Sequence, residues 1–181
     1  MHGFIFTELR DYVIARLGPD AWPNLLDRAR IGPKTYLTYR DYPDEEAVTL
    51  VVTASDLTGL PPATILEDFG AFLAPHLFRI YRPLIDPSWR TLEFLENTEA
   101  TIHQVVRSRN ATARPPTLRC RRVGAQTLVV TYGSPRRLCA VARGIIRGLA
   151  QHFGEKVEIT EPDCMLEGRP TCQIQVQRVP A

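Results

Sequence analysis

The sequence predicts an α+β protein in which a mainly helical N-terminal part precedes a small antiparallel four-stranded sheet, with one helix between its two hairpins. Three observations support this class. Apolar residues recur at helical spacing up to about residue 112, they alternate with period two in two later stretches, and a helical pattern separates those stretches. Because 181 residues suit one ordinary domain, we expect a single domain over 1–181, helical over about 1–112 and sheet-containing over about 113–181.

The helical part is divided by glycine and proline, which end one apolar pattern and open the next. Gly18-Pro19 ends the first pattern, and Pro61-Pro62 opens the fourth. The last pattern is the longest and is followed by the breaker at 113–116. Helices are therefore expected at 4–17, 20–30, 44–59, 62–80 and 91–109.

The period changes to two after the breaker, which indicates strands. The first alternating pair surrounds a Gly124-Ala125 turn, and the second surrounds Glu167-Gly168. Between them, Ser134-Pro135 is expected to cap a helix that reaches about Phe153. Strands are expected at 117–123 and 126–132, then at 156–160 and 172–178.

Composition places the chain among ordinary globular proteins, since 44% of its residues are hydrophobic and 23% are charged. The first residues contain no apolar run long enough for a signal peptide or a membrane span, so we expect a soluble, cytoplasmic protein without a membrane partner. Four cysteines are too few for a disulfide scaffold, and reduced thiols or a metal site remain open. The sequence lacks Cys-x-x-Cys-His, which excludes a covalently attached c-type haem.

Charge is distributed unevenly, with nine basic and fifteen acidic residues in 1–100 against thirteen basic and five acidic residues in 101–181. The basic half suggests an anionic partner, which could be nucleic acid, an acidic protein or a ligand carboxylate. An adaptor that binds nucleic acid or protein would use Arg107, Arg109, Arg114, Arg119, Arg121 and Arg122. A solvated basic face explains these arginines better, because interleaved exposed aromatics are missing, and we expect no nucleic-acid partner.

Motifs of common enzymes are absent from the sequence, which contains no G-x-S-x-G, H-E-x-x-H, P-loop or G-x-G-x-x-G pattern. No nucleophile–base pair suggests itself either. We therefore expect no catalytic activity.

His103 lies at the edge of the apolar stripe of the helix expected at 91–109, next to Ile102. A histidine in this setting is either a structural residue satisfied by one acceptor or a neutral imidazole that ligates a metal. His2, His76 and His152 lack this setting.

Tyr132, Ser134 and Arg136 form a Tyr-x-Ser-x-Arg motif where the second strand ends and a helix is expected to begin. Helix capping alone explains the serine. However, a phenol, a hydroxyl and a guanidinium are all hydrogen-bond donors, and three donors close together suit carboxylates. A ligating histidine and a carboxylate clamp are what the iron and the two propionates of a haem require.

With these residues the chain resembles the H-NOX family, the haem domains that sense nitric oxide or dioxygen and include the haem domain of soluble guanylate cyclase. The resemblance covers essentially the whole chain and is of the bacterial stand-alone type. Its matching pieces are Met1-His2-Gly3, Phe94-Leu95-Glu96-Asn97 before His103, Pro115-Pro116, the Tyr-x-Ser-x-Arg motif, and the ending Cys164, Gly168 and Cys172.

The resemblance implies that the fold encloses a haem b, with His103 as the axial iron ligand and Tyr132, Ser134 and Arg136 as the propionate clamp. Pro116 corresponds to the family proline that presses on the porphyrin. Dioxygen-binding members carry a distal tyrosine where this chain has Val141. The other expected neighbours of the haem are Ile5, Leu9 and Leu73.

An apolar distal side offers no donor for dioxygen, so the resemblance leads us to expect binding of nitric oxide and carbon monoxide and exclusion of dioxygen. In the family, stand-alone domains of this length signal to a histidine kinase or a cyclic-dinucleotide enzyme, and we expect a separate partner of this kind.

The cysteines suggest a second site, because some family members bind zinc through four cysteines near the C-terminus. Cys139, Cys164 and Cys172 match three of these, and Glu161 stands at the fourth position. Carboxylate can complete a zinc site, whereas reduced thiols are the alternative. A non-haem ligand-binding module, or a regulatory module that responds to redox state or zinc through its cysteines, is the alternative to a haem gas sensor.

Overall fold

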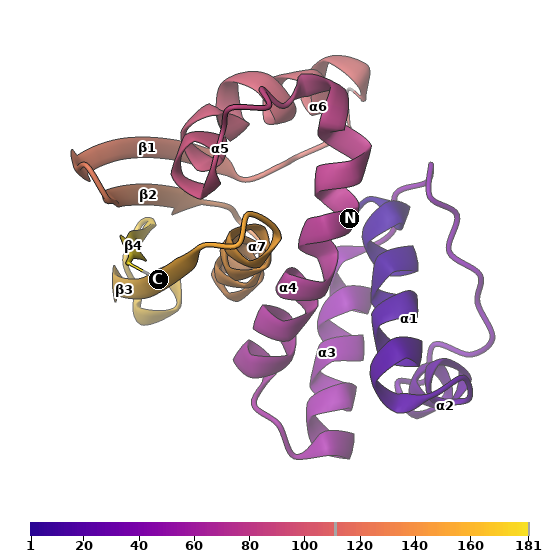
Figure 1. The fold of residues 1–181 in the computed structure, drawn as a ribbon. Coiled ribbons are helices and arrows are strands. Elements are labelled where there is room, and N and C mark those ends of the chain that lie inside the picture. Colours follow the sequence, from indigo (N-terminus) through magenta and orange to yellow (C-terminus); the bar gives the residue numbers. More distant parts are fainter. Residues whose placement is uncertain (111, 181) are drawn as a thin grey trace. The chain divides into compact units, whose positions relative to one another are not determined.

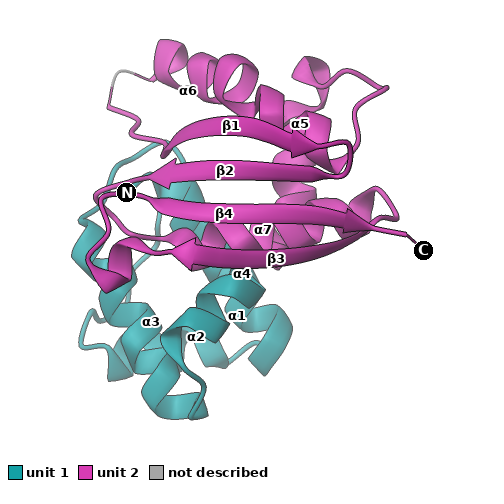
Figure 2. Cartoon of the chain, turned by 90° about the vertical axis from the view of Figure 1, so that its left-hand side faces the viewer, with its two compact units in different colours: residues 1–69 teal, residues 70–181 magenta. Residues whose placement is uncertain are grey.

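The structure, a computed structural model, describes residues 1–110 and 112–180 (Figure 1). The chain divides into two compact units, residues 1–69 and residues 70–181 (Figure 2). The single domain expected over 1–181 remains a prediction. Among the described residues, no helix combines the length and the apolar character needed to cross a bilayer.

Unit 1 is helical, and its core forms where apolar faces of its helices meet. Phe6, Leu9 and Val13 of the first helix are buried together with Leu25 and Leu50 of the next two. The helices of this unit are α1 (Gly3–Leu17), α2 (Ala21–Arg28), α3 (Asp44–Thr58) and the first part of α4 (Pro62–Tyr81). Gly59 adopts a left-handed conformation and ends α3, as its glycine predicts.

Unit 2 contains the rest of α4, a run of short helices and the sheet. The α+β class is confirmed, including the antiparallel four-stranded sheet and the helix between its hairpins. Its elements are η1 (Arg82–Leu84), α5 (Thr91–Thr98), η2 (Glu99–His103), α6 (Gln104–Arg109), β1 (Thr117–Gly124), β2 (Thr127–Gly133), α7 (Cys139–His152), β3 (Lys156–Asp163), η3 (Met165–Glu167) and β4 (Cys172–Val179).

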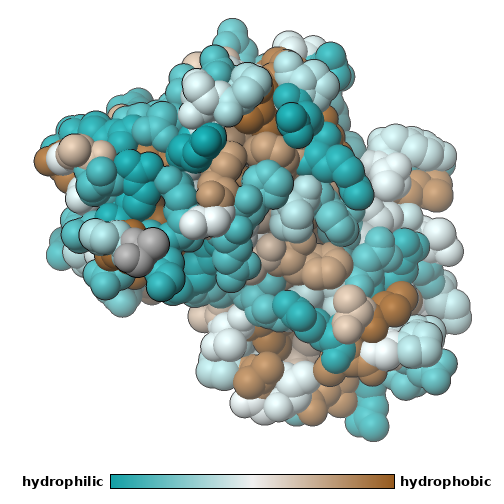
Figure 3. All heavy atoms as spheres, viewed as in Figure 1, coloured by the Kyte–Doolittle hydropathy of each residue, from teal (hydrophilic) through white to brown (hydrophobic). Residues whose placement is uncertain are grey.

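The sheet has the order β1-β2-β4-β3 with antiparallel neighbours throughout. Burial alternates along its two central strands, so that one face is apolar and lies against α5 and α7 (Figure 2). The buried side chains of this face are Leu128, Val130, Tyr132, Cys172, Ile174 and Val176. Arg119 and Arg121 of β1 are exposed, and the part of Figure 3 that corresponds to the sheet is mainly hydrophilic.

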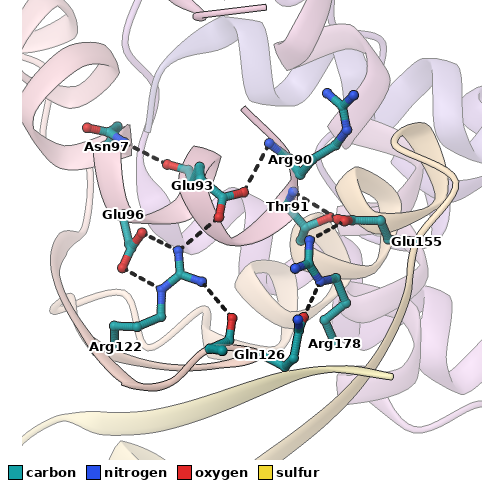
Figure 4. Close-up of polar contacts among 10 residues, drawn as sticks. Arg90, Thr91, Glu93, Glu96, Asn97, Arg122, Gln126, Glu155 and Arg178 are labelled. Atoms are coloured by element: carbon teal, nitrogen blue, oxygen red, sulfur yellow. Dashed lines mark hydrogen bonds and ion pairs between the residues drawn. The ribbon is translucent and has the colours of Figure 1, made fainter. Parts of the chain in front are cut away.

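Ion pairs attach the start of α5 to the sheet (Figure 4). Arg122 of β1 contacts both Glu93 and Glu96 of α5, at 3.0 and 2.5 Å. On the other side of this helix, Glu155 accepts a hydrogen bond from the Thr91 amide and pairs with Arg178 of β4. The helix that leads to His103 is therefore held to two strands.

The expected helix at 91–109 is interrupted by η2, which is a π-helical turn. The Gln104 amide donates to the carbonyl of Glu99, five residues earlier. Around the start of this turn, the side chains of Asn97, Thr98 and Thr101 each donate to the carbonyl four residues before. Side chains that bond in this way compete with the backbone ladder and bend helices.

The expectation that Ser134 caps the following helix is wrong, because α7 begins at Cys139. Ser134 instead opens a turn in which its hydroxyl accepts a hydrogen bond from the Arg136 amide at 3.3 Å. Arg137 then has a φ of +50°, which is incompatible with a right-handed helix. The clamp motif therefore occupies a turn between β2 and α7.

In unit 2, α4 and α7 approach each other closely. A Cβ on Gly148 of α7 would lie 2.6 Å from the Ala74 Cβ and 2.7 Å from the Ala71 carbonyl oxygen of α4. Pro75 has no amide hydrogen to offer that carbonyl, so the proline leaves a gap in the helix ladder where the glycine packs. Only glycine fits this contact.

Candidate functional site

His103 is the last residue of η2, and its side chain is 13% exposed. Its Nδ1 lies 2.9 Å from Oε2 of Glu99, which belongs to the first position of the same turn. The backbone of Pro116 also acts on the ring, raising its pKa slightly. The imidazole is therefore held at Nδ1 by a residue of its own helical turn.

The protonation of His103 follows from these contacts. Burial lowers the pKa of His103 below its ordinary value, and the Glu99 carboxylate offsets only part of this effect. The ring is therefore neutral at neutral pH. Because a carboxylate oxygen can only accept, Nδ1 carries the proton and Nε2 presents its lone pair.

Glu99 is itself ionised. Its partial burial acts to raise the pKa, but hydrogen bonds from His103, the Leu118 amide and Arg107 hold the pKa below its ordinary value. The Leu118 amide donates to Oε2 at 3.0 Å, and Arg107 donates to Oε1 at 2.5 Å. Glu99 was not among the site residues predicted from the sequence, although its four-residue spacing from His103 is a signal that could have revealed it.

Tyr132 and Ser134 lie at the end of β2 and are almost fully buried, whereas Arg136 in the turn is partly exposed. Burial raises the pKa of Tyr132 to about 12, so its phenol is a neutral donor at neutral pH. Arg136 donates from Nη1 to the Arg114 carbonyl at 2.7 Å. The motif thus combines two buried hydroxyls and one guanidinium.

The histidine and the clamp are connected through the start of β1. Glu99, which bonds His103, also bonds the amide of Leu118, and Leu118 stands opposite Tyr132 in the β1–β2 register. From the other side, Arg136 bonds the carbonyl of Arg114. The expected proline, Pro116, is half-buried between these two attachments.

This donor set suits a haem. A neutral imidazole with an available Nε2 lone pair is an axial ligand for iron, and a phenol, a hydroxyl and a guanidinium suit propionate carboxylates. No group of this set carries a negative charge that would oppose the propionates.

The remaining residues expected near the haem lie in both units. Leu73 of α4 is buried and Val141 of α7 is half-buried in unit 2, where the carbonyl of Val141 lies against Gly70. Ile5 and Leu9 lie on α1 in unit 1. That these residues surround one cavity stays a prediction.

The cysteine cluster is brought together as expected. Cys164 Sγ lies 3.7 Å from Cys139 Sγ and 3.8 Å from Cys172 Sγ, and all three residues are buried and without disulfide bonds. One carboxylate oxygen of Glu161 belongs to the same group, whose four potential ligand atoms lie within 4.8 Å of one another. Cys120 lies apart on β1, where its thiol donates to the Leu95 carbonyl at 3.3 Å.

The surroundings of this cluster favour neutral thiols when no cation is bound. Burial raises the pKa of Cys139 to about 11, and the nearby Glu161 carboxylate acts in the same direction. Glu161 pairs with Arg143 through one oxygen, while its Oε1 is buried without a hydrogen-bond partner among the residues that the structure describes. An unsatisfied buried carboxylate oxygen beside three thiols is a favourable setting for a cation.

Comparison with known proteins supports the same fold and a haem-binding family. The chain matches the Haem-NO-binding family over residues 2–161. It is similar to an H-NOX protein from S. oneidensis in the Fe(II)NO ligation state, with 26% identity, a TM-score of 0.91, and coverage of 99% of this chain and 100% of that one. The H-NOX domain from Shewanella oneidensis in the Fe(II)CO ligation state is 27% identical, with a TM-score of 0.87 and full coverage of both chains.

A curated relative is the soluble guanylate cyclase gcy-35 of Caenorhabditis elegans, which is 25% identical over 84% of this chain. The chain spans only 23% of the length of that cyclase. Since the family match extends over most of the sequence and the fold agrees with that of solved members, the chain belongs to the Haem-NO-binding, or H-NOX, family, whose members are haem-binding gas sensors.

Proposed function

We propose that this protein is a b-type haem gas sensor without catalytic activity, in which His103 binds the iron through Nε2. The main support for this proposal is the hydrogen bond from His103 Nδ1 to the ionised Glu99, which leaves Nε2 as the ligating nitrogen of a buried ring. When bound, the haem supplies a ferrous iron with an open position for a diatomic gas.

Tyr132, Ser134 and Arg136 hold the two propionates in this proposal. The two hydroxyls are buried neutral donors, and Arg136 adds the only charge-assisted bond of the motif. Pro116 would pack against the porphyrin, and within unit 2 Leu73 and Val141 would keep water from the gas side.

The gases are nitric oxide and carbon monoxide, in line with the ligation states of the two Shewanella proteins. Dioxygen is excluded because bound dioxygen carries partial negative charge and needs a hydrogen-bond donor, which Val141 cannot supply. Nitric oxide depends far less on such a donor.

The signal passes through η2. His103 is fixed to this turn, so a bound and a released imidazole correspond to two arrangements of η2 and β1. A separate partner reads the difference. A histidine kinase or a cyclic-dinucleotide enzyme is the partner class we propose.

The decisive experiment is the absorption spectrum of the purified ferrous protein before and after nitric oxide is added. A Soret band that shifts with the gas is expected, and a colourless protein would overturn the proposal. His103→Gly should lose the haem or require added imidazole to keep it. His152→Gly, which removes an exposed histidine of α7, is the matched control and should keep an ordinary haem spectrum.

For the cysteine cluster we propose a zinc site formed by Cys139, Glu161, Cys164 and Cys172. In a tetrahedral site with zinc–sulfur bonds of about 2.3 Å, neighbouring sulfur atoms lie about 3.8 Å apart. The sulfur separations of 3.7 and 3.8 Å agree with this value. Arg143, paired with Glu161, offsets part of the negative charge that three thiolates and a carboxylate would bring.

Elemental analysis of protein prepared without chelator tests the zinc site. About one zinc per chain is expected, and Glu161→Ala should weaken zinc binding by at least the roughly 10–100-fold that loss of an outer partner costs. Protein without zinc, in which all four cysteines titrate as thiols after unfolding, would show a reduced thiol cluster instead.

A further inference from the structure

Glu99 collects hydrogen bonds from three separate elements of unit 2. His103 of η2 and the Leu118 amide of β1 share its Oε2, at 2.9 and 3.0 Å, and Arg107 of α6 donates to its Oε1. The side chain is 29% exposed, so the carboxylate is partly withdrawn from solvent. A group with so many partners has little freedom to rotate.

The shared oxygen makes the orientation of His103 depend on the sheet. The Leu118 amide belongs to the backbone of β1 and cannot move without that strand, so it fixes Oε2, and Oε2 in turn fixes the Nδ1 side of the ring. Leu118 lies opposite Tyr132 in the sheet register. The orientation of the imidazole is thereby fixed relative to β1 and β2, the strand pair that carries the clamp, and not only relative to its own helix.

An anionic acceptor on Nδ1 also changes the chemistry of Nε2. A carboxylate that accepts the proton of one ring nitrogen increases the basicity of the other, as in the carboxylate–histidine pairs of metal sites. We propose that Glu99 is a positioning residue for His103, which sets the strength of the iron bond and keeps the ring attached to β1. This inference rests on the proposed function.

Two consequences distinguish this role from a merely structural one. The iron–imidazole bond should weaken in the order wild type, Glu99→Gln, Glu99→Ala, because glutamine keeps an acceptor but loses the charge. The gas response should change in the same order, with nitric oxide releasing His103 more readily. Loss of outer partners of metal-ligating histidines typically costs about 10–100-fold in affinity or activity, and a shift of this size in the ratio of five- to six-coordinate nitrosyl is expected.

Glu96→Gln is the matched control. Glu96 lies on α5 three residues earlier and also pairs with an arginine, Arg122 of β1, but no contact with His103 is found for it within 1–110 and 112–180. Both variants remove one carboxylate that attaches the same helical run to the same strand. Only Glu99→Gln should affect the iron–histidine bond.

The experiment measures the iron–histidine stretching band of the ferrous protein by resonance Raman spectroscopy, together with the nitrosyl absorption spectrum. A lower frequency in Glu99→Gln, lower still in Glu99→Ala and unchanged in Glu96→Gln, supports the proposal. Equal frequencies in all four proteins overturn it. Circular dichroism melting shows whether each variant folds. If Glu99→Ala does not fold, the comparison of Glu99→Gln with Glu96→Gln and the wild type decides.

A measurement without haem separates failure of this inference from failure of the proposed function. In the haem-free full chain, nitrogen-detected NMR of the His103 ring reports which nitrogen carries the proton. The Nδ1–H tautomer is expected in the wild type and in Glu96→Gln, with conversion toward Nε2–H in Glu99→Ala. An Nε2–H ring in the wild type overturns the role of Glu99, whatever the protein is found to bind.

Discussion

Loss of haem from the Arg136→Ala variant tests the clamp quantitatively. Arg136 is the only charged member of the motif, and its removal leaves the propionates with the neutral hydroxyls of Tyr132 and Ser134. Hydrogen bonds to charged groups contribute about 1.5–3 kcal/mol, which corresponds to about 10- to 150-fold in rate if the whole loss appears in dissociation. Because Arg136 is partly exposed, solvent screening favours the lower end, and we expect haem loss about tenfold faster.

The assay follows transfer of haem to an excess of haem-free globin after mixing. Arg119→Ala is the control, since it removes the same charge from an exposed position of β1 and should release haem at the wild-type rate. Arg136 also bonds the Arg114 carbonyl at 2.7 Å, so melting of the haem-free proteins must show that the segment before β1 is intact. A rate within about twofold of wild type in Arg136→Ala would refute the clamp.

Three further changes test separate parts of the structure. Val141→Tyr should introduce a donor on the gas side and give a dioxygen spectrum in air that the wild type lacks, whereas an oxy complex of the wild type would contradict the selectivity argument. Gly148→Ala should destabilise the protein by about 1–3 kcal/mol, because the new Cβ meets Ala74 at 2.6 Å, although alanine normally gains about 1 kcal/mol over glycine in a helix; a higher melting temperature would disprove the close contact. Burial acts to raise the pKa of Glu155, but hydrogen bonds from Thr91 and Arg178 hold this pKa below its ordinary value. Ionised Glu155 therefore stabilises the folded protein above the ordinary pKa, and this stabilisation is lost as pH falls through the lower pKa of the folded state. Glu155→Gln should therefore reduce the loss of stability on acidification, and identical acid unfolding curves would count against this contribution.

The sequence could predict the fold class because periodicity reports which side chains are buried. The change from helical spacing to alternation marks the sheet, and the strands of both hairpins lie within a few residues of their expected bounds. Periodicity does not report where a helix changes its pitch. The π-helical turn at Glu99–His103 occurs together with hydrogen bonds from Asn97, Thr98 and Thr101 to backbone carbonyls, which the apolar pattern does not record.

The candidate site was predictable to the extent that its residues form a local motif. Tyr132, Ser134 and Arg136 are close in sequence, so their proximity follows from the chain itself. Serine followed by proline is equally suitable for a turn and for a helix start, which is why the beginning of α7 was misplaced. The contact from Glu99 to Leu118 joins residues nineteen positions apart and depends on how η2 packs against β1, which no local pattern specifies.

The order of strands has a consequence for how the protein folds. β4 follows β3 along the chain but lies between β3 and β2 in the sheet. The β1–β2 and β3–β4 hairpins can therefore each form locally, and the pairing of β2 with β4 comes later. Joining them closes the long connection through α7, and contacts of this kind form slowly because the loop entropy is lost before they are made. Until β4 arrives, β2 has an open edge and Tyr132, the partner of Cys172 in the finished sheet, is held on one side only. We expect a folding intermediate that contains the β1–β2 hairpin but does not retain haem, and stopped-flow experiments with haem present from the start should show the Soret change lagging behind the formation of secondary structure.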